Sequence, residues 1–432
     1  MQAQPSPPVP EGAKKLKGND ASHRSRLATK WKICGLLFLA TTLNYLDRQT
    51  LSILAPILQK EMHLDNAALG WLFAVFYYAY TLSHFLVGPI LDRSHLRWAF
   101  GIAVLAWSTV SMMTSLARGF ASLIIFRLLL GIMESANWPA AIRIVARTME
   151  PRERALGNGI FTSGTSVGAL IAPSVILGIS AVLGWRWAFV VVGALGVFWI
   201  GGWLLATRGQ ELAAVWQETR GSRIEASGFQ LRTFAQIVRS PRFFPVLIVS
   251  ILVNPCLYFS VNWLPTYFAQ QRGLTPGRQL GWILTMIYLG LDIGNLICGT
   301  VILRLVRRGY QILAARRVVF LLATVPLLFC AAVPYLPSLY QAVCVLVGVN
   351  IGLGIWIAMY LTMAQDISQT HISTSIGILS GSGSLAGALA MWGVGRVTKA
   401  TASFAIPMTA FALAAGVAAC AAWIASREAK GD

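Results

Sequence analysis

Charged side chains occur inside segments of this sequence that are otherwise apolar. Asp47 and Arg48 are neighbours in the segment Trp31–Leu58, which is long enough to cross a bilayer with a hydrocarbon core of about 30 Å. A charge at the centre of a membrane helix costs at least about 2.5–3.5 kcal/mol. The pair therefore indicates a function, such as a water-filled cavity, a site for a charged ligand or a path for protons.

Two further apolar segments carry polar side chains at helical spacing. In one of them, Arg127 and Glu134 are seven residues apart, which is close to two helical turns and places both on one stripe. In the other, Tyr77, Tyr80 and His84 form a second stripe. We expect the helices to turn these faces, together with the Asp47–Arg48 pair, toward one shared cavity.

Each of these groups also has a structural interpretation. The Asp47–Arg48 pair could lock two helices together, and Arg127 with Glu134 could form a static polar clamp. The tyrosines could be packing or interfacial aromatics. We favour a functional interpretation of Asp47 and Arg48 because neighbours in sequence point in different directions, so that each charge still needs another partner.

The second half of the chain has fewer polar groups in its apolar segments. Asn262, Asp292 and Asn295 are the candidates for a polar site there. Asp292 could bind an ion or substrate, or it could be a structural acceptor near a helix end. Pro255 and Pro265 interrupt the same segment as Asn262, and such breaks are tolerated where neighbours or a cavity satisfy the freed backbone groups.

The composition sets the fold class. Hydrophobic residues make up 56% of the 432 residues and charged residues 12%, whereas soluble domains contain about 25% charged residues. Apolar stretches of about twenty residues recur along the chain, which predicts an all-α polytopic membrane protein. The six cysteines lie in or beside these stretches without ligand spacing, so we expect neither disulfides nor a metal site. Twelve spans are predicted, at residues 31–58, 67–90, 98–117, 121–146, 155–183, 186–206, 243–268, 280–303, 316–333, 338–363, 374–396 and 402–425.

One long polar connection divides these spans into six plus six. The expected units are a disordered cytoplasmic N-tail, a six-helix bundle, a basic cytoplasmic linker, a second six-helix bundle and a short cytoplasmic C-tail. Their bounds are 1–30, 31–206, 207–242, 243–425 and 426–432.

The positive charges predict the orientation in the membrane. If both termini and the linker lie on one side, that side carries 26 of the 35 Lys and Arg residues and the other side seven. An excess of Lys and Arg marks the cytoplasm, so we expect both termini to be cytoplasmic. The net charge of +19 then follows from topology, and it does not indicate a nucleic-acid partner.

The loop after the second span carries a signature, GPILDRSHLR at residues 88–97. It resembles the G-x-x-x-D-R-x-G-R-R loop of the major facilitator superfamily, although His95 replaces the loop glycine. The six-plus-six organisation is similar to that superfamily over nearly the whole chain, and it implies a pseudo-symmetric fold with substrate between the halves. The resemblance also implies a cytoplasmic latch, for which the candidates are Gly88, Asp92, Arg93, Arg97, Glu150 and Arg154.

Further stretches resemble the anion:cation symporter family, which includes bacterial hexuronate and aldonate transporters. They are LNYLDR (43–48), FRLLLGIMESANWPA (126–140), RERA (152–155), SGTSVG (163–168) and WLPTY (263–267). The resemblance implies import of a sugar-acid anion with protons across the cell inner membrane by alternating access. It implies no cofactor besides the co-transported proton.

The same resemblance assigns roles to residues. Arg48 would hold the substrate carboxylate, Arg127 would be a second basic anchor, and Asp47 and Glu134 would couple protons. The implied substrate-binding set is Tyr45, Arg48, Tyr80, Arg127, Asn137 and Thr165. We hypothesise that Glu134 pairs with Arg127 in one state and releases that arginine when it is protonated.

Other functions remain as alternatives. A carrier for aromatic acids or dicarboxylates of the same family would also use an arginine and tyrosines. A non-transporting membrane sensor on the same fold would usually carry longer tails or soluble domains. The sequence shows no nucleophile motif or phosphate loop, so we do not expect an enzyme. One chain holds a full twelve-helix unit, so a monomer in the lipid bilayer suffices.

Overall fold

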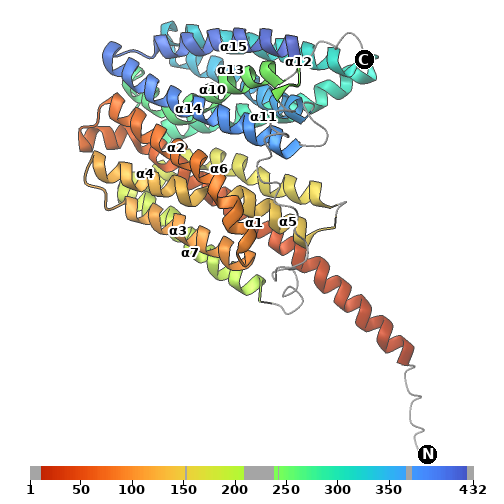
Figure 1. The fold of residues 1–432 in the computed structure, drawn as a ribbon. Coiled ribbons are helices and arrows are strands. Elements are labelled where there is room, and N and C mark those ends of the chain that lie inside the picture. Colours follow the sequence, from red (N-terminus) through yellow and green to blue (C-terminus); the bar gives the residue numbers. More distant parts are fainter. Residues whose placement is uncertain (1–10, 151–152, 209–237, 242, 366–371, 426–432) are drawn as a thin grey trace, which may run out of the picture.

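The described part of the chain is almost wholly helical (Figure 1). The computed structural model describes residues 11–150, 153–208, 238–241, 243–365 and 372–425. Its helices are α1 (Glu11–Met62), α2 (Asn66–Arg93), α3 (Leu96–Thr114), α4 (Phe120–Glu134), α5 (Asn137–Thr148), α6 (Arg154–Leu183), α7 (Trp185–Ala206), α10 (Phe243–Gln271), α11 (Arg278–Arg307), α12 (Ile312–Leu328), η2 (Phe329–Tyr335), α13 (Leu339–Gln365), α14 (Ile372–Thr401) and α15 (Ala405–Ala425).

These helices correspond to the predicted spans. The fourth span consists of α4 and α5, and the ninth of α12 and the 3₁₀ helix η2. Within the described residues, ten spans are long and apolar enough to cross a membrane. The ten do not include α1 and α2. The all-α polytopic class is confirmed.

The first helix is longer than the sequence predicted. α1 begins at Glu11, so residues 11–30 are helical where a disordered tail was expected, and Figure 1 shows this part projecting from the bundle. Ala and Lys recur there and favour helix, and extending an existing helix needs no new nucleus. Residues 1–10, most of the predicted linker and the C-tail 426–432 lie outside the described residues.

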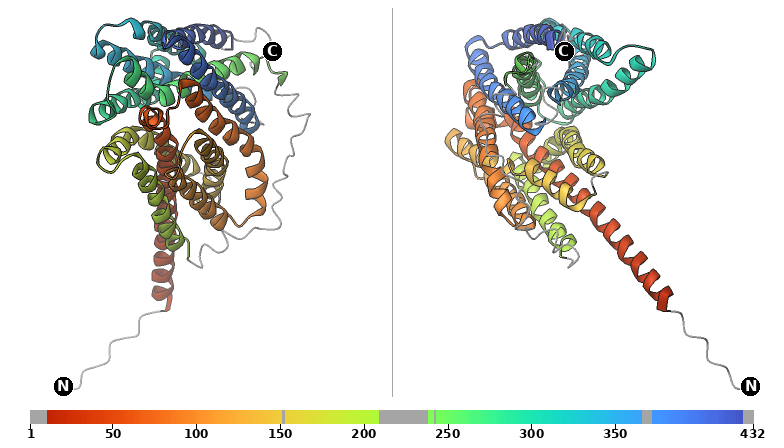
Figure 2. Two further views of the ribbon diagram at one scale, coloured as in Figure 1. Left: turned by 90° about the vertical axis from the view of Figure 1, so that its left-hand side faces the viewer. Right: turned by 45° about the vertical axis from the view of Figure 1, so that its right-hand side comes forward.

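Two groups of helices, α1–α7 and α10–α15, pack against each other (Figures 1 and 2). The contacts between these halves are made by α2 with α14, α6 with α11, and α1 with α10. The α2–α14 crossing is close because glycines meet there. A Cβ atom on Gly70 would lie 3.0 Å from the Cα of Gly395 and 2.8 Å from the carbonyl oxygen of Met391.

One end of the bundle is closed by polar contacts between the halves. We call it the far side, where α1 ends and α2 begins; the opposite end is the N-terminal side. On the far side Lys399 forms an ion pair with Asp65 at 2.7 Å. Asn66 donates to Oε1 of Gln270 at 3.1 Å, and Gln270 donates to Oε1 of Gln59 at 3.1 Å.

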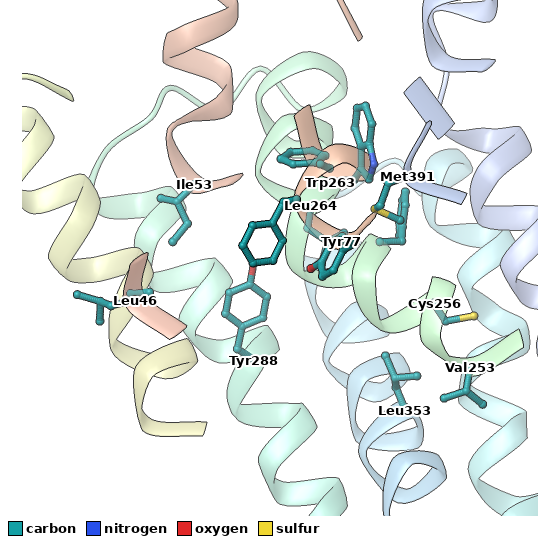
Figure 3. Close-up of a cluster of buried hydrophobic side chains, with 14 of the residues drawn as sticks. Leu46, Ile53, Tyr77, Val253, Cys256, Trp263, Leu264, Tyr288, Leu353 and Met391 are labelled. Carbon is teal, nitrogen blue, oxygen red and sulfur yellow. The ribbon is translucent and has the colours of Figure 1, made fainter. Parts of the chain in front are cut away.

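Apolar side chains from both halves fill the region between them. Figure 3 shows Tyr77 beside Trp263, Leu264 and Met391, with Tyr288 reaching toward them from α11. Phe73 packs edge-to-face on Trp263 with ring centroids 5.4 Å apart. This buried layer separates the far side from the polar groups inside the first half.

Candidate functional site

Arg48 and Glu134 form a buried ion pair inside the first half. The Nε and Nη2 atoms of Arg48 both donate to Oε2 of Glu134, at 3.2 and 3.1 Å. Glu134 is fully buried, and Arg48 is 9% exposed. Because removing either partner would leave an uncompensated buried charge, the pair depends on both residues or on a replacement ion.

The fourth span breaks directly after Glu134, which the sequence analysis did not predict. α4 ends at Glu134 and α5 begins at Asn137. Pro139 has no N–H, so the carbonyl of Ser135 lacks its usual helical donor; this proline was the available signal. The negative end of the α4 dipole lies at Glu134, so the cation of Arg48 is favoured beside it.

Three aromatic rings surround the guanidinium of Arg48. Its Cζ atom lies 4.6 Å from the ring centroid of Tyr80, 4.9 Å from that of Tyr45 and 5.1 Å from that of Phe76. Ring faces attract cations. Tyr45 and Tyr80 were predicted, whereas Phe76 was missed, although it stands four residues before Tyr80 and on the same face of α2. The cage fixes the plane in which Arg48 can offer its donors.

Arg127 is a buried cation with free donors. It is 2% exposed, and its Nη1 atom donates to the carbonyl oxygen of Arg48 at 3.5 Å. Its Cζ atom lies 4.7 Å from the centroid of Phe76. Within the described residues its Nε and Nη2 atoms have no hydrogen-bond partner. Burying such donors without a partner costs free energy. These N–H groups are therefore available to donate to a bound anion.

The pairing of Arg127 with Glu134 was expected in one state; in this conformation Glu134 pairs with Arg48 instead, and the pairing with Arg127 stays a prediction. Two helical turns separate Arg127 from Glu134 by about 10 Å along α4. The packing of α1 in the first half instead brings Arg48 directly against the end of α4.

Asp47 points away from this pair. Ser111 of α3 donates to its Oδ1 atom at 2.5 Å, while Oδ2 has no hydrogen-bond partner among the described residues. Asp47 is 1% exposed and Ser111 2%. The neighbours Asp47 and Arg48 thus contact different helices. Ser111 was missed, because one serine in an apolar helix carries no distinctive signal.

Asn262 of α10 connects the two halves next to this region. It donates to the hydroxyl of Tyr77 at 3.1 Å and accepts from Ser52 at 2.7 Å. Tyr77 also stacks on Tyr258 of α10, with centroids 3.9 Å apart and planes at 9°. The predicted residue Asn262 therefore belongs to the contact between the halves.

The other candidates of the second half do not join Asn262. Asp292 of α11 lies beside Ser166 of α6, across the boundary between the halves. In the part of the chain that the structure describes, no hydrogen bond connects Asn262, Asp292 and Asn295. A single second-half polar site is not assembled in this conformation.

Two predicted substrate-binding residues make local contacts. Asn137 donates to the hydroxyl of Thr41 at 3.4 Å, and its Oδ1 atom has no partner within the described ranges. Thr165 donates to the carbonyl of Thr162 in its own helix at 2.8 Å. Their contact with a substrate stays a prediction.

The predicted latch on the N-terminal side is only partly described. The side chains of Gly88, Asp92, Arg93 and Arg154 lie outside the described residues. Arg97 donates to the hydroxyl of Thr207 at 2.9 Å and to the carbonyl of Leu204 at 3.2 Å, both in its own half. Glu150 is exposed, and its backbone N–H donates to Glu153 at 3.3 Å. The latch stays a prediction.

The ion pair on the far side includes a titratable group outside the membrane-spanning segments. A hydrogen bond from Lys399, followed by one from the backbone N–H of Ala68, lowers the pKa of Asp65 from its ordinary value. Asp65 also caps α2, since its Oδ1 atom accepts from Ala68 at 2.7 Å. Among the described residues, no cluster of three His, Cys, Asp or Glu side chains could hold a metal ion.

Known proteins are similar to this chain in sequence. The chain is 28% identical over 297 residues to a D-galactonate transporter of Escherichia coli O6:H1, covering 65% of this chain and 69% of that protein. It is 30% identical over 295 residues to a hexuronate transporter of Bacillus subtilis, with coverages of 66% and 67%. A probable sulfoacetate transporter of Cupriavidus necator is 26% identical over 92% of this chain and 94% of its own length.

Solved structures agree on the fold. A bacterial homologue of the human lysosomal transporter Spinster, in an inward-facing and occupied conformation, superimposes with a TM-score of 0.75 at 20% identity, covering 91% of this chain and 96% of that one. The sequence profile of the Major Facilitator Superfamily matches residues 37–391. The chain therefore belongs to the Major Facilitator Superfamily of membrane transporters, and it is similar to sugar-acid transporters within it.

Proposed function

We propose that this protein is a proton-coupled symporter that imports a sugar-acid anion, a hexuronate or an aldonate, by alternating access. The relatives named for D-galactonate and hexuronate support this substrate class. The observation that carries the proposal is the ion pair in which two donors of Arg48 hold one oxygen of Glu134. A substrate carboxylate needs the same donors.

Competition for Arg48 provides the coupling. While Glu134 is charged, it occupies the guanidinium and opposes a second carboxylate. A proton on Glu134 removes that charge, so Arg48 is free to grip the substrate carboxylate through its planar fork. Binding of the anion therefore requires uptake of a proton at Glu134.

Arg127 gives the site a second anion-binding group. Its Nε and Nη2 atoms have no partner among the described residues, and its guanidinium lies near that of Arg48, because both contact the ring of Phe76. Sugar hydroxyls or the far carboxylate oxygen could accept from these Nε and Nη2 atoms.

The access cycle follows from the two ends of the bundle. The excess of Lys and Arg supports an orientation in the cell inner membrane with both termini cytoplasmic. The far side, closed by Asp65–Lys399 and the Asn66–Gln270 contact, is then the outer side. In this orientation the structure has its outer side closed, and import requires the far side to open.

Two measurements test the proposal. A thermal-shift screen of the purified protein should show stabilisation by glucuronate, galacturonate or galactonate. Uptake of the stabilising compound into proteoliposomes should then require an inward proton gradient. Binding without uptake would favour a sensor. Uptake that is equally fast without a pH gradient would contradict proton coupling.

A small dianion is the second candidate. The relative that aligns over 94% of its length is named a probable sulfoacetate transporter, and two buried arginines could hold two anionic groups. In the same screen, stronger stabilisation by sulfoacetate or a dicarboxylate than by any sugar acid would favour this candidate. Stabilisation by aromatic acids alone would contradict both.

A further inference from the structure

We propose that Ser111 is the positioning residue for Asp47, and that the two form a proton site on the α3 face of α1, separate from the anion site at Arg48 and Glu134. This inference rests on the proposed function, in which protons drive uptake. It deepens that function by giving the two buried acids different surroundings and different partners.

The geometry around Asp47 is asymmetric. Its Oδ1 atom accepts from the Ser111 hydroxyl at 2.5 Å, whereas its Oδ2 atom has no hydrogen-bond partner among the described residues. A proton is therefore expected on Oδ2, while the serine holds Oδ1 in both protonation states. The carboxyl group need not rotate when the proton binds or leaves.

Close helix packing fixes the serine. Gly193 of α7 lies against α3, where an added Cβ atom would approach the backbone nitrogen of Met112 to 3.0 Å. Ser111 immediately precedes Met112, and its side chain is 2% exposed. The hydroxyl is thus held by a rigid backbone, as a positioning group requires.

The charges around Asp47 place this site apart from the substrate. Arg48 is its neighbour in sequence but donates to Glu134 of α4. α3 presents a neutral hydroxyl, and α10 has no charged residue. The charged residues of α6 and α7 lie in the first turns of those helices, at Arg154 and Arg186. Asp47 therefore accepts from the neutral hydroxyl of Ser111, whereas Glu134 accepts from the cation of Arg48.

This difference predicts the direction of a mutational effect. A hydroxyl that donates to a carboxylate favours its charged form. Without it, Asp47 should keep its proton to higher pH. Hydrogen bonds to charged groups are strong enough to move a titration by about one to two pH units.

The test compares Ser111→Ala with the unmodified protein in proteoliposomes. We expect the pH profile of uptake to move to higher pH by about one to two units, and Ser111→Thr to restore the original profile. Thr109→Ala is the matched control, because its hydroxyl bonds to the carbonyl of Leu105 on the exposed side of the same helix. It should leave the profile unchanged. If Ser111→Ala does not fold, Ser111→Cys should give a smaller shift in the same direction.

A second readout separates this inference from the proposed function. Infrared titration of the protonated carboxyl band, with Asp47→Asn to identify it, reports Asp47 without any transport. A shift of this band in Ser111→Ala supports the inference even if no sugar acid is carried. If uptake is proton-driven but Ser111→Ala shifts neither the pH profile of uptake nor the infrared band, the inference is overturned and the proposed function stands. In the Asp47→Asn background, Ser111→Ala should add no further change, and an additional shift would show that Ser111 acts elsewhere.

Discussion

Arg48 donates two hydrogen bonds to a single oxygen of Glu134, leaving the other oxygen, Oε1, without a hydrogen-bond partner among the described residues. The pair connects α1 to the end of α4 deep inside the first half. An arginine held in this way is preorganised for a carboxylate, because its aromatic cage and donors already have the required positions. In the proposed function, Glu134 occupies the position that the substrate carboxylate would take.

Glu134→Gln should separate exchange from accumulation. The amide keeps the size of the side chain but neither carries the charge nor binds the proton, so Arg48 stays available to the anion. We expect substrate counterflow to persist and accumulation driven by a pH gradient to be lost. Glu61→Gln is the matched control, since Glu61 pairs with Arg186 on the exposed far side. Full proton-driven accumulation by Glu134→Gln would contradict the coupling role.

Arg48→Lys should lose substrate affinity although the charge is kept. Lysine has no planar fork, and one hydrogen bond to a charged group is worth about 1.5–3 kcal/mol, which corresponds to a loss of about ten- to a hundredfold in affinity. Titration with the stabilising sugar acid measures this change. Arg186→Lys, in an exposed ion pair, serves as the control. Near-normal affinity of Arg48→Lys would show that a point charge is enough.

The fold could be predicted from the sequence because hydrophobicity alone determines where helices cross a bilayer. The break in the fourth span was missed although Pro139 signals it, because the apolar pattern continues through the break and the proline lies beyond it. The helical extension of α1 was also missed, because its polar composition resembles that of a disordered tail. Both differences concern local backbone preferences that hydrophobicity does not encode.

The members of the site could be predicted more reliably than their contacts. A charge inside a membrane segment is costly, which marks Asp47, Arg48, Arg127 and Glu134 in any reading of the sequence. Which arginine pairs with Glu134 depends on how α1 packs against α4, and this is decided by packing over whole helices. The neutral Ser111 could not be distinguished from other hydroxyls in apolar helices.

Gly70→Val should prevent closure of the far side. A Cβ atom added at Gly70 would lie within 3.0 Å of the backbone of α14, so a branched side chain forces α2 and α14 apart. We expect substrate binding to persist and turnover to fall at least about tenfold, in line with a barrier raised by more than about 1.4 kcal/mol. Gly393→Val is the control, because nothing lies within 4 Å of a Cβ atom there. Equal turnover in both variants would show that α2 and α14 need not approach closely.

The Asp65–Lys399 ion pair should stay intact over the pH range in which protons drive transport. The pKa of Asp65 is lowered, chiefly by the hydrogen bond from Lys399, from an ordinary value of about 3.9. A lowered pKa means that the contribution of the pair is present above the ordinary value and is lost only as pH falls through the lower, folded value. Distances between spin labels on α2 and α14 should therefore not change between about pH 5 and pH 8. Lys399→Gln should widen them at every pH in that range, whereas a pH-dependent widening in the unmodified protein would place a proton switch on the far side.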